Sequence, residues 1–360
     1  MEEDLLTAVF SKNELQKKYK NYFAPAAKIS VGPSGKDIES GAGVQLESIQ
    51  VSLNIDGAAS ASFTVTDLYR PGENGIKQSV KSLLICGAAV KIELGYGSEY
   101  VDVFHGFIYE ISTQFSEMPS MQVTAMDVKR LMADNMRLGH VWQNQTLSEI
   151  FHEVMADYAG LNLTPTVCGS AGDAVETIIQ RGSDLWLIKK LCRAKGLRFM
   201  VYGNQAKLLA KSESSAVISL SWGSDLISFS QNAAYVNVHV EVRGSVKGSP
   251  ETDTVIQSQD VAGEGAKTCG ISPTIRVIEE TNVKSAGEVA DRLNDEVEAL
   301  KESMYSCRAS CMGMPVLIPG RYIGIEGIDS AADGEYYLKE VRHSFGTDGF
   351  TTDFTLGGKR

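Results

Sequence analysis

The spacing of hydrophobic residues changes twice along the chain, from a period of two to the period of a helix and back again. Between residues 27 and 137, apolar residues alternate with polar or small ones, most clearly from Val90 to Tyr96. Such alternation puts every second side chain on one face of a strand. We therefore predict antiparallel strands with one solvated face. The same alternation recurs around residues 49–55, 63–65, 107–111 and 121–125.

Residues 142–211 begin with helical spacing, and the ends of both predicted helices are marked. The first helix begins at the capping box formed by residues 146–149 and is expected to end at Gly160. The second begins after Ser183 and ends at Gly196, a residue type that commonly terminates helices. These signals predict two amphipathic helices packed on a common core.

The period of two then returns. Two short apolar runs are separated by Gly203-Asn204, the spacing of a hairpin with a two-residue turn. Alternation is clear again from Val236 to Val242, where valines are separated by polar residues. Further strands are predicted at residues 197–202, 205–210, 322–325, 336–345 and 350–356.

Three segments stand apart from this pattern. Residues 1–24 form an extension in which Leu5, Leu6, Val9 and Phe10 make one short helical face, which needs a partner surface or is otherwise a frayed tail. Residues 244–274 are rich in Gly, Ser, Asp and Pro and are expected to be a long excursion. A capped amphipathic helix is predicted at residues 285–303.

A short motif occurs twice. Glu110-Ile111-x3-Phe115, followed by a turn and a strand, parallels Glu340-Val341-x3-Phe345, which is followed in the same way. Two similar modules in one chain would let three copies present six similar modules in a ring, so that a threefold object could meet a sixfold one. The motif is short, and any two hairpins could produce it.

The stretch from Trp142 to Gly196 resembles the late control protein D family. The resemblance is carried by Trp142-x3-Thr146-Leu147 before a helix, by Leu161-Asn162-Leu163, and by the run from Arg181 to Leu191 followed by Gly196. Members of this family are baseplate hub proteins of contractile phage tails and injection systems, and the hub part of VgrG is similar.

The resemblance implies a mainly β, α+β fold with two antiparallel tube-type β-barrels and an intervening helix-hairpin α+β domain. We expect an N-terminal extension, a first barrel, the α+β domain, and a second barrel that carries the excursion and the long helix. The corresponding boundaries are 1–24, 25–137, 138–215 and 216–360. Closing short strands into barrels removes exposed edges.

The same resemblance implies a structural role without enzymatic activity. The expected partners are two further copies in a homotrimer, a tail tube or tube-initiator protein, a separate spike protein, and other baseplate proteins. Which machine it serves, a phage tail, a bacteriocin-like tail, an extracellular injection particle or a type VI system, stays open. A cell-wall hydrolase and a receptor-binding component are the alternatives.

Charge, cysteine spacing and hydropathy argue against several classes of function. The net charge of −11, spread along 360 residues, argues against specific nucleic-acid binding. The six cysteines lack a disulfide or zinc spacing and are expected to be small hydrophobic residues in a reducing cytoplasm, where the protein is synthesised and assembled. No apolar run approaches the length of a membrane span.

No motif predicts a catalytic, cofactor-binding or metal site. His152-Glu153 resembles the start of a zinc-protease helix, but Ala156 stands where the second histidine is required. The remaining histidines are isolated in sequence, and the three tryptophans are expected in cores or interfaces. The local positive cluster around Lys189, Lys190 and Arg193 is either a solvated helix face or a dock for an acidic partner.

Overall fold

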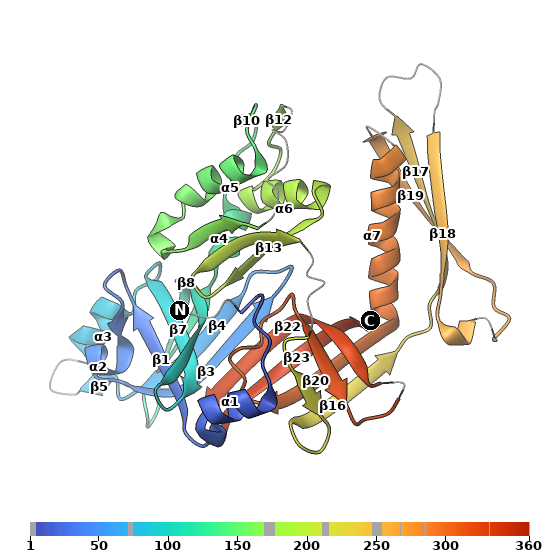
Figure 1. Cartoon of the computed structure of the whole chain (residues 1–360). Coiled ribbons are helices and arrows are strands. Elements are labelled where there is room, and N and C mark those ends of the chain that lie inside the picture. The colour runs from blue at the N-terminus through green and yellow to red at the C-terminus, as the bar shows by residue number, and fades with distance from the viewer. Residues whose placement is uncertain are drawn as a thin grey trace. The chain divides into compact units, whose positions relative to one another are not determined.

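The computed structural model describes residues 5–70, 75–168, 177–210, 216–246, 254–266, 268–283, 286–330 and 332–359 (Figure 1). The chain divides into two compact units, and each is described by itself. Unit 1 comprises Met1–Ser228 and Ala309–Thr355, and unit 2 comprises Phe229–Arg308 and Leu356–Arg360. The fold is mainly β with helices, and its largest sheet has 13 strands, most of which are antiparallel. The predicted α+β class is confirmed at this level.

The first set of strands in this sheet, module 1, has six main members. They lie in the order β3-β4-β9-β8-β7-β1. The alternation of buried side chains agrees with the sequence, since Ala61, Phe63 and Val65 of β4 are buried and their neighbours are not. The strands are β1 (Pro25–Val31), β3 (Gln45–Asn54), β4 (Ser60–Thr66), β7 (Ala89–Tyr96), β8 (Glu99–Gln114) and β9 (Ser120–Met126).

Short elements accompany these strands. They are β2 (Lys36–Asp37), α2 (Ile38–Ala42), β5 (Tyr69–Arg70), β6 (Gly75–Ile76) and α3 (Gln78–Leu83). Strand β2 pairs with β1 at the edge of the large sheet, whereas β5 and β6 pair with each other.

The second set of strands, module 2, also has six main members. They lie in the order β16-β20-β23-β22-β21-β15. The strands are β15 (Ser219–Ser221), β16 (Leu226–Ala233), β20 (Tyr305–Met312), β21 (Tyr322–Glu326), β22 (Gly334–Gly346) and β23 (Gly349–Lys359).

The two modules have the same strand order. When the six strands of each module are numbered in chain order, both read 2-3-6-5-4-1 across the sheet. The modules differ at strand 1, because β1 is antiparallel to β7 whereas β15 is parallel to β21. The short motif seen twice in the sequence therefore lies on equivalent strands, β8 and β22. These pairings establish strand order, and the closure of each module into a tube-type barrel stays a prediction.

The helical stretch packs on a hydrophobic core of its own within unit 1. Its core joins α5 and α6 to the β13–β14 hairpin through buried apolar residues that include Ile150, Phe151, Ile188 and Leu208. Figure 1 shows both helices beside this hairpin. The elements are α4 (Val128–Asp134), β10 (Val141–Trp142), α5 (Leu147–Ala156), β11 (Thr164–Val167), β12 (Ile178–Ile179), α6 (Asp184–Ala194), β13 (Leu197–Tyr202) and β14 (Gln205–Ala210).

The predicted local signals in this domain are largely confirmed. Thr146 and Glu149 form a reciprocal capping box, the Ser183 hydroxyl accepts a hydrogen bond from the Trp186 N–H, and the hairpin strands have the predicted bounds. The end of the first helix was placed too late. It ends at Ala156, and a short 3-10 helix follows at Ala159. Tyr158 is buried, but it lies in the turn between these two helices and not in the first helix.

The N-terminal extension, where the structure describes it, packs against the rest of unit 1 and is not frayed. Leu5, Leu6 and Phe10 are buried, but the backbone there forms a turn and not a helix, and Val9 is exposed. Helix α1 (Lys12–Lys18) begins at the predicted capping box of Ser11. The buried guanidinium of Arg321 donates to the backbone carbonyls of Leu5 and Ala8, which fixes the extension to module 2.

Unit 2 has a three-stranded sheet of its own. In it β17 (Asn237–Val246) lies between β18 (Thr254–Ala262) and β19 (Thr274–Val283), and α7 (Ala286–Met304) packs along it. The predicted strand near residue 240 is present, but it belongs to this separate sheet. Part of the predicted excursion at 244–274 is thus regular structure, because β18 lies within it. Ser285, the predicted helix cap, is outside the described residues.

Candidate assembly site

The two modules meet at a seam between β3 and β22. The first part of β22 pairs with β21, and from Glu340 to Phe345 the same strand pairs with β3 instead, from Asn54 to Ile49. Val51 and Val341 on this seam are fully buried. Strand 5 of module 2 thus leaves its own strand 4 and takes strand 2 of module 1 as its neighbour.

His343 lies within the seam and is completely buried. Its Nε2–H donates to the carbonyl oxygen of Leu317 at 3.2 Å, and its Nδ1 accepts from the Thr352 hydroxyl at 3.0 Å. The Thr352 oxygen in turn accepts the N–H of Met314 at 2.9 Å. Burial lowers the pKa of His343 to about 4, because the protonated ring would lose its hydration. The ring is therefore neutral at neutral pH.

In module 1 the equivalent strand 5, β8, has no such neighbour within the described part of the chain. Its pairing with β7 ends near Ile108, which exchanges hydrogen bonds with Gly87 and Ala88. From Glu110 to Gln114 it pairs with β9 on one side. The side chains of this end are mostly exposed, and Phe115 beyond it is 64% exposed. We call Glu110–Gln114 the free end of β8.

Strand 2 of module 2, β16, is the last strand on its side of the large sheet among the strands that the structure describes. The hydroxyl groups of Ser228 and Ser310 meet at 2.7 Å, so these residues share a face. Because neighbouring residues alternate between faces, Ile227 lies on the face of the buried Cys311, yet it is 55% exposed. We call the outer side of β16 the free edge.

The predicted basic cluster lies on α6 and is partly used inside the chain. Lys189 donates to the carbonyl oxygen of Asp56, between β3 and β4, at 2.5 Å. The Lys190 ammonium lies 4.9 Å from the centre of the Trp186 ring. Arg193 is exposed in the last turn of the helix. Binding of an acidic partner by these three residues stays a prediction.

The run from Arg181 to Leu191, which carries the family resemblance, has a structural role at the start of α6. The carboxylate of Asp184 is fully buried and is held by the Arg137 guanidinium, the Tyr158 hydroxyl and the amide groups of Asn135 and Gln180. Asp184 is the first residue of the helix, where the dipole favours an anion. This network joins the segment after α4 to the start of α6.

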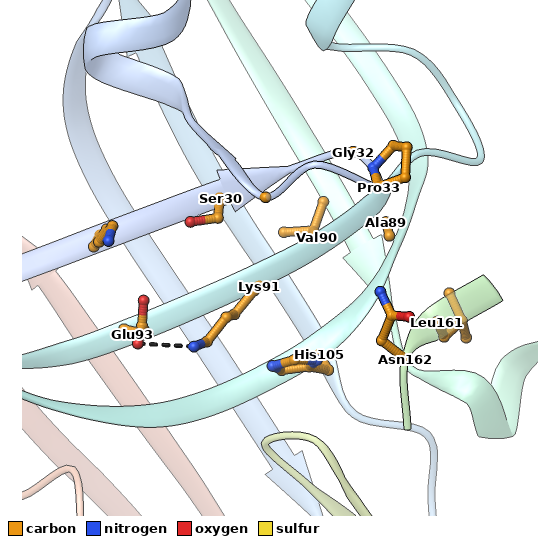
Figure 2. A pocket seen from close by; sticks show the side chains of 12 residues that line it. Ser30, Gly32, Pro33, Ala89, Val90, Lys91, Glu93, His105, Leu161 and Asn162 are labelled. Atoms are coloured by element: carbon orange, nitrogen blue, oxygen red, sulfur yellow. Dashed lines mark ion pairs between the residues drawn. The ribbon is translucent and has the colours of Figure 1, made fainter. Parts of the chain in front are cut away.

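A pocket of about 360 Å³ lies between β1, β7, β8 and the turn at Asn162 (Figure 2). Three basic residues line it, Lys28, Lys91 and His105, and carboxylates contact the last two. Lys91 contacts Glu93 at 2.9 Å, and His105 contacts Asp102 at 2.8 Å. The residues that line this pocket offer no arrangement of nucleophile, base and stabiliser.

The remaining candidates for chemistry are mostly structural. Trp142 is buried and donates to Gln180, as expected of a core residue, whereas Trp186 and Trp222 are partly exposed. All six cysteines are free thiols; three are buried and three, Cys86, Cys168 and Cys269, are exposed. In the described part of the chain no cluster of acidic, histidine and cysteine residues could hold a metal ion. No helix among those described residues is long and apolar enough to cross a membrane.

Residues 25–346 match the sequence family described as Alg8 N-terminal domain. The chain belongs to this family. No curated protein matches the chain.

Two of the solved structures similar to this Alg8 N-terminal domain family member are tail proteins. The 43 kDa tail protein of prophage MuSo2 from Shewanella oneidensis has a TM-score of 0.71 and 14% identity over 92% of this chain and 98% of its own. A tail protein from Neisseria meningitidis MC58 has a TM-score of 0.70 and 12% identity, with coverages of 93% and 97%.

A third similar structure is the E. coli c3393 protein. It is described as a component of the type VI secretion system with structural similarity to the T4 bacteriophage tail proteins gp27 and gp5. Its TM-score is 0.53 and its identity 12%, over 88% of this chain and 76% of its own. The predicted resemblance to tail hub proteins is confirmed as a resemblance of fold.

Sequence reasoning missed the seam and the two free strand segments of this family member. The repeated motif indicated that β8 and β22 are equivalent, but sequence could not show that β22 changes neighbours along its length. A signal for the free edge was present. Residues 226–238 contain no charged residue, in a chain of which 22% is charged.

Proposed function

We propose that this chain is a structural hub of a contractile tail or contractile injection system. Three copies would form a ring of six similar tube-type barrels, with a hexameric tail tube on one side and a separate trimeric spike protein on the other. Other baseplate proteins would bind its periphery. The role is mechanical, since the ring transmits thrust from tube to spike, and no catalysis is assigned to it.

The repeated strand order carries the proposal. One chain contains two modules with the order 2-3-6-5-4-1, joined edge to edge by the β3–β22 seam. Three such chains supply six near-equivalent modules, which is the number needed to match a sixfold tube with a threefold assembly. The likeness in fold to phage tail proteins and to a type VI secretion component supports the same assignment.

The mass and symmetry of the purified full-length chain test the proposal. We expect a native mass of three times the 39.0 kDa chain mass, and electron-microscopy averages with threefold symmetry and six similar densities around an opening. A chain that stays monomeric at every concentration reached, or a particle with another symmetry, would overturn the trimeric hub.

A further inference from the structure

We propose that the free edge of β16 in one copy pairs antiparallel with the free end of β8 in the next copy. This contact would repeat, between chains, the seam that β3 and β22 form within a chain. The inference rests on the proposed trimeric hub and deepens it, because it names the two strands that join neighbouring copies.

The first argument is equivalence. The internal seam joins strand 2 of one module to strand 5 of the other. Strand 5 of module 1 carries the same motif as its counterpart, with Glu110 and Phe115 in place of Glu340 and Phe345. Each copy therefore uses one strand 2 and one strand 5 internally and retains one of each.

The second argument is that the free edge of β16 lacks the protection that a solvent-exposed edge normally has. Natural proteins blunt edge strands with charged residues, proline or bulges, because unpaired backbone groups invite another strand. Strand β16 has no charged residue and no proline over its eight residues. Ile227 lies on its core face and is still 55% exposed, so a further strand is needed to cover it.

The third argument is closure. A contact between strand 2 of one copy and strand 5 of the next is heterologous, so it produces either a ring or an open filament. If the contact between copies turns the chain by the same angle as the internal seam, successive modules are related by one rotation. If that rotation is one sixth of a full turn, six modules, and hence three chains, close the ring that the proposed function requires.

Disulfide cross-linking tests the pairing. Ser228 and Ser230 lie on the outer face of module 2, together with Ser310. Ser112 and Gln114 lie on the outer face of module 1. Their strand neighbours Ile111 and Thr113 lie on the core face, because they pair with the buried Val123 and Met121. We expect Ser230→Cys combined with Gln114→Cys or with Ser112→Cys to cross-link neighbouring copies. The products should be dimers and trimers without larger species.

Two matched controls accompany this experiment. The test variants and the controls are all made in a chain whose three exposed cysteines are replaced by serine. Gln50→Cys with Ser344→Cys, a facing pair of the internal seam, should form a disulfide within one chain. Ser230→Cys with Thr113→Cys, which points to the other face, should not cross-link copies. If the native mass is trimeric and the internal control forms, but neither outer-face pair links copies, the pairing is wrong while the trimer stands.

A charge at the free edge gives an independent readout. Ile227→Lys should convert the trimer to a folded monomer, since a lysine in an edge strand opposes strand addition. Ile256→Lys is the matched control, because Ile256 is 57% exposed on β18 of unit 2, compared with 55% for Ile227. A trimer that survives Ile227→Lys contradicts the inference, whereas a wild-type monomer contradicts the proposed function itself.

Discussion

His343→Gln should remove a large acid sensitivity from the folded chain. The imidazole is fully buried in the seam between the modules, and its pKa falls from the ordinary 6.5 to about 4. In the unfolded chain it takes up a proton near its ordinary pKa. Between these two values the unfolded state binds more protons than the folded state, so stability rises with pH across this window.

The size of the effect follows from the shift. A difference of roughly 2.5 pKa units corresponds to a free energy of unfolding of about 3 kcal/mol. This stability is fully present above about pH 6.5, is lost progressively as the pH falls, and is almost gone near pH 4. Glutamine has no proton to gain in this range, so the variant lacks this dependence.

A second buried group opposes His343 in the wild-type chain. Asp127 is fully buried at the start of α4, and burial raises its pKa from 3.8 to about 6. Here the folded state binds more protons than the unfolded state, so acid stabilises the fold between about pH 6 and 3.8. The two dependences overlap, and the wild-type curve alone would show little of either.

The difference between the two chains is therefore the quantity to measure. Urea unfolding of wild type and His343→Gln at a series of pH values gives the free energy of unfolding of each. The advantage of wild type over the variant should shrink by about 3 kcal/mol between pH 8 and pH 4. Asp127→Asn is the matched control, and it should change the pH dependence in the opposite direction. A constant difference between wild type and His343→Gln would refute the reasoning.

Further predictions concern the buried network and a close backbone approach. Asp184→Asn should lower the free energy of unfolding, measured by thermal melts, by roughly 3–5 kcal/mol, because it leaves the Arg137 guanidinium without its buried partner. Asp157 is the second, exposed partner of Arg137. Asp157→Asn should cost less than about 1 kcal/mol in the same measurement. Gly106→Ala should cost at least about 1–3 kcal/mol, since the added Cβ would lie 2.2 Å from the carbonyl oxygen of Met126. A melting temperature within one degree of wild type for Gly106→Ala would show that β8 and β9 separate more easily than their pairing indicates.

Local signals in the sequence predicted the local structure well. Side-chain caps such as Thr146 and Ser183 act within one turn of a helix, and the Gly203-Asn204 turn fixes its own hairpin, so neighbouring residues suffice to specify them. The actual end of α5 differs from the predicted one, because Tyr158 reaches the same core from the turn after the helix and continues the apolar spacing beyond it.

Long-range features were not readable in the same way. A half-buried strand near Val240 looks the same whether it belongs to the large sheet or to the separate sheet of unit 2, because alternation reports burial and not the identity of neighbours. The candidate site has the same difficulty. The Glu110 and Glu340 motifs identified equivalent strands, but only the pairing of β22 with β3 shows what each strand requires as a neighbour.

The seam also sets an order for synthesis. Asn54 pairs with Glu340, so the edge of β3 leaves the ribosome long before its partner strand has been made. At typical translation rates of about 5–20 residues per second, the wait is on the order of tens of seconds. Module 1 must spend this time with the edge of β3 unpaired, and the two modules can lock together only after β22 has been made.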